Sequence, residues 1–341
     1  MSPIKSSLAR SASKLFGVFR DRDTSLRGFV QSKRTPPPFA ASGGTKIPAS
    51  TAGNGYVYHV FTSDDTFTQT AGPAGSIDVL IVAGGGAGGG RYYSGGGGAG
   101  GVVSTNSSVS FTGSAPVVVG DGGAATGEDT RGNIGSDSSF GSVTAKGGGG
   151  GGSYSTNGVG GPGGSSGGSS GYHIDDTDRI AAAPQPVPGD YTAYGNAGGR
   201  GDNPQGYSGG GGGGAGAVGS DGASSTGGPG GNGRAFPAFP GTIIAPAIPS
   251  PVRPSWTPAV GPTGLYGGGG GGANYYNTGG DPTGGTGGGG RGAGPDTGST
   301  DSAVAGVDHT GGGGGGANYS PGNAGKAGGK GVVIVRYAEP S

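Results

Sequence analysis

Three glycines that follow an apolar stretch have the spacing of a phosphate-binding loop. Gly84, Gly86 and Gly89 match the pattern G-x-G-x-x-G directly after the residues VLIVA. In a dinucleotide site, such glycines let the backbone approach the pyrophosphate at the start of a helix, and an acidic residue about 20 positions later binds the ribose. Here the chain continues RYYSGGGG, which does not predict a helix, and Asn106 stands where the acidic residue is needed. The context therefore argues against nucleotide binding.

Side chains that could bind a metal or perform acid–base catalysis are sparse. His59, His173 and His309 lie in unrelated contexts, and residues 175–178 (DDTD) form the only local cluster of metal-ligand types. Three carboxylates could hold Ca²⁺, but the spacing and the late glutamate of an EF-hand are absent. We predict a solvated loop and leave open whether it binds an ion. No Ser-His-Asp or paired-glutamate arrangement can be argued from the sequence, so we expect no cofactor, no metal site and no enzymatic activity.

Aromatic side chains gather in the inserts that separate the glycine-rich blocks. These inserts cover residues 169–194, 234–266 and 273–283, and the second holds the only tryptophan and many prolines. Proline-fixed loops lose little entropy on binding, and aromatic residues are over-represented at binding hot spots. We predict that eight residues contact a receptor: Tyr172, His173, Tyr191, Phe236, Phe239, Trp256, Tyr275 and Tyr276. The alternative is that the tryptophan and the phenylalanines pack inward, and the sequence leaves both open.

Glycine dominates the chain that must position these inserts. There are 94 glycines and 25 prolines among 341 residues, and no cysteine. Four runs of six glycines cover residues 147–152, 209–214, 267–272 and 311–316, and the last two runs continue as GGGGGGANY. Only 30% of residues are apolar, so a conventional core across the whole chain is not expected. Without cysteine, disulfides and thiolate metal sites are excluded.

The spacing of the six-glycine runs suggests that they are structural. An isolated glycine run is costly to order and should stay flexible. Without a Cβ atom, however, a run can adopt the left-handed polyproline II conformation, whose N–H and C=O groups point outward and can bond to neighbouring runs. We therefore expect a slab of packed polyglycine II helices held by backbone hydrogen bonds. Flexible spacers are the alternative.

Strand-forming stretches lie at both ends of the glycine region. They alternate apolar and polar residues or form short apolar runs, which is typical of strands. The expected strands cover residues 56–69, 76–83, 102–111, 116–119, 138–145 and, at the end, 331–337 (GVVIVRY). The fold class that we predict is mostly β and irregular, with a short N-terminal helix, a small β portion and then the polyglycine II slab with its loop inserts.

Composition predicts four parts of the chain. Residues 1–35 form a basic amphipathic anchoring helix, and residues 36–55 form a linker rich in proline and serine. Residues 56–146 form a β-rich domain. Residues 147–341 form the glycine-rich domain, which the strand at 331–337 closes.

The N-terminal segment differs from everything after it. Residues 1–34 hold eight basic and two acidic residues, an excess of six positive charges that the rest of the chain balances. One predicted helical face carries Leu8, Ala12, Leu15, Phe16 and Phe19, with Arg10 and Lys14 off that face. We predict that this helix anchors the protein on a partner; a transit peptide and an interfacial membrane helix are the alternatives. No apolar run is long enough to span a bilayer.

Four segments carry a resemblance to glycine-rich phage tail-fibre and adhesin proteins. They are SIDVLIVAGGGAGGG (76–90), SGGGGAGGVV (94–103), SSFGSVTAKGGGGGG (138–152) and GGKGVVIVRY (328–337). The resemblance covers about residues 56–337 and rests on the set of glycine blocks. In such proteins, glycine segments form a lattice of polyglycine II helices and loops at one end touch the host receptor. The basic N-terminal helix resembles the virion-docking segments that begin many tail fibres.

The resemblance implies a virion protein that acts by binding. We expect a tail fibre or receptor-binding adhesin in the virion, docked on other tail proteins through residues 1–35. The inter-glycine loops would contact a host cell-surface protein or polysaccharide. We expect a homo-oligomer, with a trimer as one option, and no nucleic acid partner. The alternatives are a structural decoration or tail-assembly protein without receptor binding, and an unfolded glycine-rich protein.

Overall fold

A computed structural model describes residues 36–125, 127–154, 158–172, 179–202, 207–224, 226–274, 280–294, 302–318 and 324–339. The chain divides into two compact units, 1–38 and 39–341. Only residues 36–38 of the first unit are described, and they carry no helix or strand. The predicted anchoring helix, with Leu8, Arg10, Lys14, Leu15, Phe16 and Phe19, therefore lies outside the described residues.

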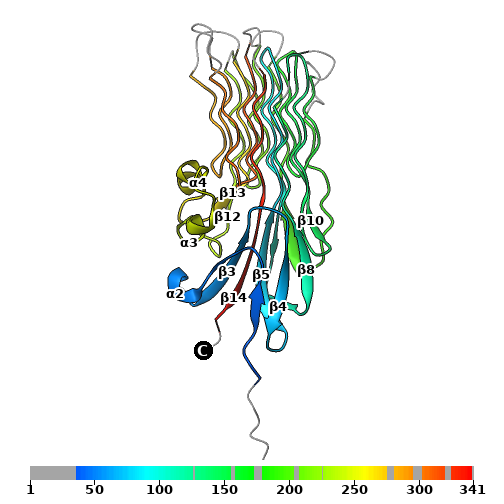
Figure 1. The fold of residues 1–341 in the computed structure, drawn as a ribbon. Coiled ribbons are helices and arrows are strands. Elements are labelled where there is room, and N and C mark those ends of the chain that lie inside the picture. The colour runs from blue at the N-terminus through cyan, green and yellow to red at the C-terminus, as the bar shows by residue number, and fades with distance from the viewer. Residues whose placement is uncertain are drawn as a thin grey trace, which may run out of the picture. The chain divides into compact units, whose positions relative to one another are not determined.

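Two antiparallel sheets form the base of the second unit (Figure 1). In the seven-stranded sheet the order is β11 (Tyr191–Tyr194), β6 (Val102–Thr105), β5 (Gly75–Val82), β14 (Val332–Ala338), β3 (Tyr56–Phe61) and β2 (Thr45–Ile47), with β7 (Val109–Phe111) also paired to β5. In the five-stranded sheet the order is β1 (Ala40–Ser42), β4 (Asp65–Ala71), β8 (Ser114–Val118), β9 (Ser138–Phe140) and β10 (Val143–Ala145).

The last strand of the chain lies in the middle of the larger sheet. Ile334 of β14 pairs with Val60 of β3 on one side and with Leu80 of β5 on the other. Successive side chains of a strand point to opposite faces of the sheet. Val333 therefore enters the core between the two sheets, whereas Ile334 enters the core on the opposite face. Burial on both faces explains why GVVIVRY reads as a nearly continuous apolar run.

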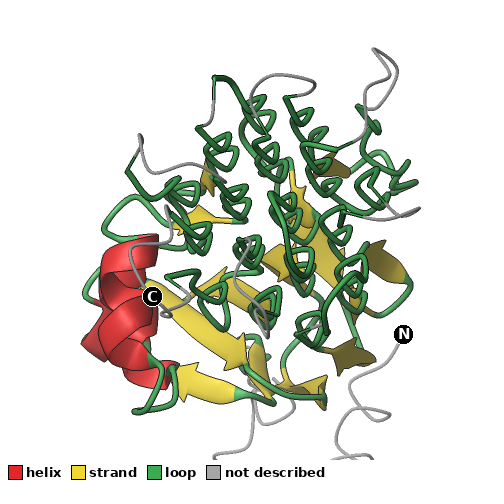
Figure 2. Ribbon diagram, turned by 90° about the horizontal axis from the view of Figure 1, so that it is seen from above, coloured by secondary structure: helices red, strands yellow, loops and turns green. Residues whose placement is uncertain are grey.

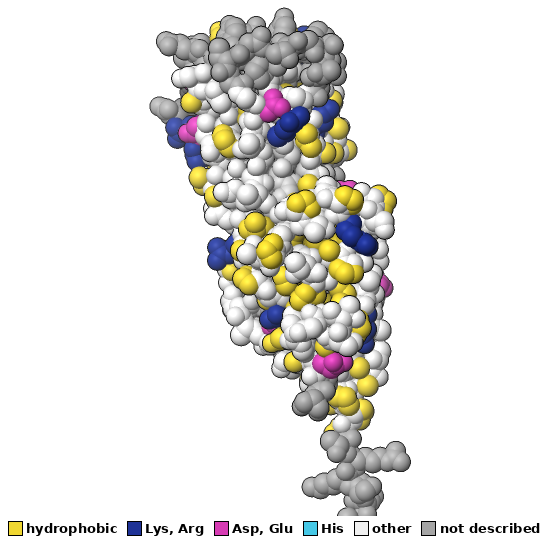
Figure 3. Space-filling model, turned by 90° about the vertical axis from the view of Figure 1, so that its left-hand side faces the viewer, with side chains coloured by type: hydrophobic (Ala, Val, Ile, Leu, Met, Phe, Trp, Pro, Cys, Tyr) yellow, Lys and Arg dark blue, Asp and Glu magenta, His cyan; other side chains and the backbone are white. Residues whose placement is uncertain are grey.

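A helical insert, residues 234–266, covers the outer face of the larger sheet. It contains α3 (Gly241–Ile244), η2 (Ala245–Ala247) and α4 (Arg253–Val260), and its ends pair as β12 (Arg234–Ala235) and β13 (Leu265–Tyr266). A further short helix, α2 (Ala49–Ala52), precedes β3. The insert places Trp256 in the outer core, where its indole N–H donates to the His309 carbonyl at 2.9 Å. The solvent side of the insert forms an apolar surface (Figure 3).

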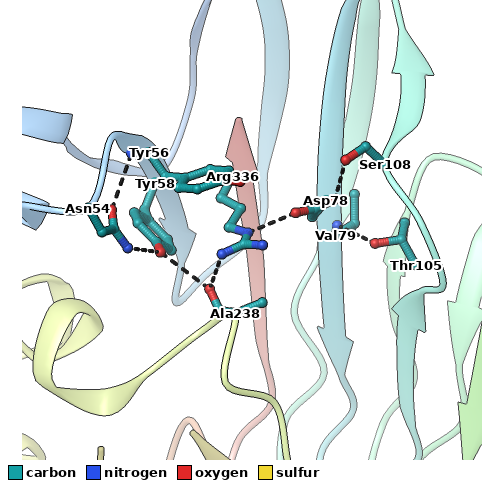
Figure 4. A network of polar contacts seen from close by, with 9 residues as sticks. All are labelled: Asn54, Tyr56, Tyr58, Asp78, Val79, Thr105, Ser108, Ala238 and Arg336. Atoms are coloured by element: carbon teal, nitrogen blue, oxygen red, sulfur yellow. Dashed lines mark hydrogen bonds and ion pairs between the residues drawn. The ribbon is translucent and has the colours of Figure 1, made fainter. Parts of the chain in front are cut away.

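A polar network fastens this insert to the sheet (Figure 4). The Arg336 guanidinium donates to the Asp78 carboxylate on β5 at 2.8 Å and to the Ala238 carbonyl of the insert at 3.0 Å. The Tyr58 hydroxyl donates to the same carbonyl at 3.3 Å, and Arg336 also lies 4.2 Å from the centroid of the Tyr56 ring. One side chain of β14 therefore holds both a neighbouring strand and the insert.

Extended glycine segments continue from the sheets and lie beside one another (Figures 1 and 2). We call them the glycine array; they are the described parts of residues 83–101, 119–137, 146–171, 195–233 and 267–331. Their backbone amides donate to carbonyls of other segments with a repeat of three residues along the chain. Within the first segment, residues 83–90 bond to residues 94–101 through the pairs Ala83–Gly101, Gly86–Gly98 and Gly89–Gly95, at 2.8–3.0 Å.

All four six-glycine runs surround one segment, residues 94–101. Each run exchanges at least one backbone hydrogen bond with this segment. The bonds include Gly98 N to Gly149 O, Gly96 N to Gly210 O, Gly270 N to Gly97 O and Gly97 N to Gly314 O, at 2.8–3.0 Å. A Cβ atom on Gly97 would lie less than 3.0 Å from a backbone oxygen, which real Cβ atoms essentially never show. Glycine is therefore required at position 97, where the neighbouring backbone comes this close.

The predicted fold class needs correction. The regular secondary structure of the described residues is mostly β-sheet, in three sheets with few helices. The predicted slab of polyglycine II helices is wrong as the fold class, because the glycine segments carry no regular helix and join one another through hydrogen bonds as extended chain. The expectation of a mostly β chain agrees with the structure.

The predicted boundaries also differ from the structure. The segment expected to be a linker, 36–55, contains β1, β2 and α2, because β1 pairs with β4 and β2 pairs with β3. The segments 56–146 and 147–341 belong to one compact unit, since β14 pairs with both β3 and β5. The strands expected at 76–83 and 331–337 are confirmed, whereas the stretch 56–69 forms two strands, β3 and β4, which belong to different sheets.

The packing of the array predicts a large penalty for a single methyl group. Gly97→Ala should lower the free energy of unfolding by at least about 3 kcal/mol, because rigid backbone surrounds the site. Denaturant unfolding, followed by the fluorescence of the buried Trp256, measures this. Gly189→Ala is the matched control, since nothing lies within 4 Å of its added Cβ, and it should change stability by less than about 0.5 kcal/mol. Equal stability of the two variants would contradict the packing argument.

Two buried histidines make stability depend on pH. His59 lies between the sheets with Nδ1 2.7 Å from the Gly43 carbonyl, and His309 lies with Nδ1 3.2 Å from the Gly331 carbonyl. Burial lowers the pKa of both imidazoles below the ordinary value of 6.5, although the carbonyl contacts raise it in part. Lys46 lowers the pKa of His59 further. The neutral form of each ring therefore stabilises the folded state.

The free energy of unfolding should consequently be highest above pH 6.5. It should fall as the pH drops from 6.5 toward the pKa values that the two histidines have in the folded protein. The loss is at most about 1.4 kcal/mol per pH unit for each histidine. Urea midpoints measured between pH 7.5 and 5.0 test this, and His309→Gln should make the dependence shallower. If the urea midpoint does not change across this range, unfolding does not change the protonation of the two rings.

Candidate functional site

Five tyrosines form an aromatic group at the end of the glycine array. This tyrosine cluster consists of Tyr92, Tyr93, Tyr154, Tyr172 and Tyr207. Ring centroids lie 4.4 Å apart for Tyr154 and Tyr172, 4.6 Å for Tyr92 and Tyr154, and 5.3 Å for Tyr93 and Tyr207. Tyr93 is buried and Tyr172 is 47% exposed, and the other three rings are half-buried. The cluster therefore joins segments that are far apart in the sequence.

The cluster lies where the chain turns back, at Arg91–Tyr93. Residues 83–90 leave the larger sheet directly after β5, and residues 94–101 return directly to β6. The turn is therefore the part of this hairpin farthest from the sheets. Arg91, Tyr92 and Tyr93 have φ values of 54°, 44° and 26°, which side-chain-bearing residues rarely adopt. Strained backbone of this kind concentrates at functional sites.

Backbone hydrogen bonds fix this turn against neighbouring segments. The Tyr92 amide donates to the Asn318 carbonyl at 2.9 Å, and the Tyr93 carbonyl accepts from the Gly171 amide at 2.9 Å. Asn318 follows the last six-glycine run, and Gly171 directly precedes Tyr172. Backbone hydrogen bonds therefore position the segments that carry the rings, as they also join the segments of the glycine array.

Charged groups border the cluster on one side. The Arg91 guanidinium lies 3.1 Å from both the Glu128 and Asp129 carboxylates and donates to the Tyr92 hydroxyl at 2.9 Å. Its carbon centre is 4.5 Å from the centroid of the Tyr92 ring. Burial raises the pKa of Tyr154, as do Tyr172, Tyr92 and Asp129. The site can therefore offer ring faces, hydroxyl groups and carboxylate oxygens to a ligand.

The repeated ANY sequence has a structural role beside this site. Asn274 and Asn318 are both buried. The Asn274 amide donates to the Gly280 carbonyl at 3.0 Å, and its oxygen accepts from the Gly227 amide. The Asn318 amide donates to the Gly294 carbonyl at 3.1 Å. Each asparagine thus ties the end of a six-glycine run to neighbouring segments.

The structure separates the predicted receptor-contact residues. Phe236, Phe239 and Trp256 are 8%, 3% and 0% exposed and pack in the outer core, so the inward-packing alternative describes them and they cannot meet a partner from this position. Tyr191 is half-buried on β11 against the inner core. Tyr172 alone among the described members is exposed and belongs to the tyrosine cluster. The prediction also named three residues that lie outside the described residues: His173, Tyr275 and Tyr276.

Sequence reasoning missed the other four tyrosines of the cluster. The available signal was their position next to glycine blocks, in RYYSGGGG, GGGGGGSY and YSGGGGGG. A tyrosine at the end of a glycine block lies where an extended segment stops, so the sequence gives these four residues a common kind of position. It does not show that segments as distant as those of Tyr92 and Tyr207 meet at the same end of the array.

The other candidate motifs have structural explanations or no ligand. Gly84, Gly86 and Gly89 lie within the array, where their amides donate to Ser136, Gly98 and Gly95 rather than to a phosphate. Within the described segments, no group of three or more His, Cys, Asp or Glu is placed to hold a metal ion. The acidic loop 175–178 lies outside those segments. None of the described helices has the length and apolar character needed to cross a bilayer.

Comparison with known proteins bears on the glycine region. A family profile for a glycine-rich domain matches residues 62–338, which include most of both sheets, the array and the helical insert. None of the curated proteins matches the sequence. Because the match covers far more than half of the chain, the protein belongs to the glycine-rich domain family.

Proposed function

We propose that this protein is an attachment protein of a phage virion, either a tail fibre or a receptor-binding adhesin, without enzymatic activity. Residues 1–35 dock on other tail proteins, and the end of the glycine array contacts the host surface. The proposal starts from the basic, amphipathic N-terminal sequence and from the likeness of the glycine blocks to those of phage adhesins. It places the protein in the virion, as a homo-oligomer for which a trimer is one option.

One observation carries this proposal: the tyrosine cluster lies at the end of the array opposite the sheets. The chain enters the compact unit at β1 and leaves it after β14, both in the sheet portion (Figure 1). The turn at residues 91–93 lies at the other end of the glycine segments. A protein that is held near its N-terminus and binds with its far end needs this separation of ends.

The array supplies stiffness to such a binding end. Each segment is hydrogen-bonded along its length to its neighbours, so the turns that carry the tyrosines have little freedom to lose. A preorganised surface binds with a smaller entropy cost than a flexible one. Tyrosine suits this use because its ring offers a large rigid contact area and its hydroxyl group adds hydrogen bonding.

A second candidate function is a structural decoration or tail-assembly protein. The exposed face of the helical insert favours it, because apolar side chains gather there (Figure 3). Seven prolines on this face are exposed: Pro237, Pro246, Pro249, Pro251, Pro254, Pro258 and Pro262. An apolar surface of this kind suits contact with a neighbouring subunit.

Deletion of residues 1–35 tests the two halves of the proposal. Because residues 39–341 form a compact unit, the shortened chain should fold with unchanged Trp256 fluorescence. Particles should lose the shortened protein, whereas the purified fragment should bind the surface of the bacterial host and reduce phage adsorption. If particles keep the shortened protein, residues 1–35 are not the anchor. A fragment that folds but binds no host cell would favour the structural alternative.

A further inference from the structure

We propose that the tyrosine cluster binds a neutral polysaccharide through stacking of sugar rings. This inference rests on the proposed function and names the ligand class of the same binding end. Pyranose rings present C–H bonds of partial positive charge on one face, and these pack on the electron-rich face of an aromatic ring. Their hydroxyl groups need hydrogen-bond partners at the edge of the same surface.

The arrangement of the rings suits successive sugar units. Tyr172 exposes 47% of its surface and contacts Tyr154, which contacts Tyr92, with centroid separations of 4.4 and 4.6 Å. Tyr92 and Tyr154 are half-buried, so part of each ring remains accessible. Tyr93 lies beneath them, buried and within 5.8 Å of both rings. The cluster is thus a connected aromatic platform instead of a set of separate side chains.

Polar groups stand at the border of this platform. Arg91 holds Glu128 and Asp129 in place, and the exposed fractions of these two carboxylate side chains are 39% and 41%. Carboxylate oxygens accept hydrogen bonds from sugar hydroxyl groups, and the phenol groups both donate and accept. Aromatic faces bordered by fixed polar groups are the combination that orients a small ligand in a protein site.

The local charge selects among saccharides. Among the described residues of this border, Arg91 stands against two carboxylates, so these three side chains together carry a net negative charge. An acidic polysaccharide would be repelled, whereas a neutral one would not. The composition also favours sugar over a protein surface. The exposed large aliphatic side chains of the described residues are Val118, Ile134, Val218 and Val304, and none belongs to the cluster or its charged border.

The test uses the full-length chain and a glycan microarray that carries neutral and acidic bacterial polysaccharides. We expect binding to neutral glycans only. Tyr172→Ala should weaken binding at least about tenfold, because it removes the most exposed ring. Tyr172→Phe keeps the ring and should stay within about threefold of the parent protein. Tyr191→Ala removes a tyrosine far from the cluster and should leave binding unchanged. Trp256 fluorescence confirms that each variant is folded.

Cell binding separates this inference from the function on which it rests. Host cells should lose the ability to bind the protein after periodate oxidation of their surface glycans and should keep it after protease treatment. If binding instead survives periodate and is lost after protease treatment, and no glycan on the microarray is bound, the polysaccharide proposal is wrong. The protein would then be an attachment protein that recognises a protein receptor. Glycan binding that Tyr172→Ala leaves intact would overturn the site. A folded chain that binds neither glycans nor cells would overturn both proposals.

Discussion

The structure depends on close contact between backbones that carry no Cβ atoms. The central segment, residues 94–101, bonds to all four six-glycine runs, and an added methyl group on Gly97 would overlap a neighbouring carbonyl. Hydrophobic burial is concentrated in the sheet portion and the helical insert, where the two main cores lie, and the array adds one small cluster of alanines. In the array, mutual satisfaction of N–H and C=O groups takes the place of apolar packing. This division explains how a chain with so few apolar residues builds an ordered unit.

Sequence reasoning succeeded where a single strand carried its own signal. GVVIVRY and SIDVLIVA are apolar on successive positions, and both are strands of the larger sheet. It failed at β1 and β2, because three-residue strands separated by Gly43 and Gly44 look like a linker and are defined only by their partners. The predicted fold class is wrong for a similar reason, because the array is defined by hydrogen bonds between distant segments, which no local sequence pattern shows.

The candidate site shows the same limit. Tyr172 lies in a long insert, which predicts a binding loop, whereas Tyr92 and Tyr93 only border glycine blocks, and that position does not show which residues they meet. The sequence leaves the orientation of Trp256 open, since α3 has only four residues and α4 contains prolines, so neither shows a clear apolar face. Its burial follows from a surface that only the folded sheet provides. Residues that gain their role from distant partners cannot be assigned from local sequence.

The central position of β14 has a consequence for the order of events in the cell. A ribosome makes β3 and β5 about 250 residues before the strand that lies between them. Until β14 has been made, both neighbouring strands have an unfilled edge, and Asp78 and the helical insert lack the arginine that joins them. The N-terminal half of the chain alone therefore cannot complete the larger sheet. That sheet can close only once β14 has been made.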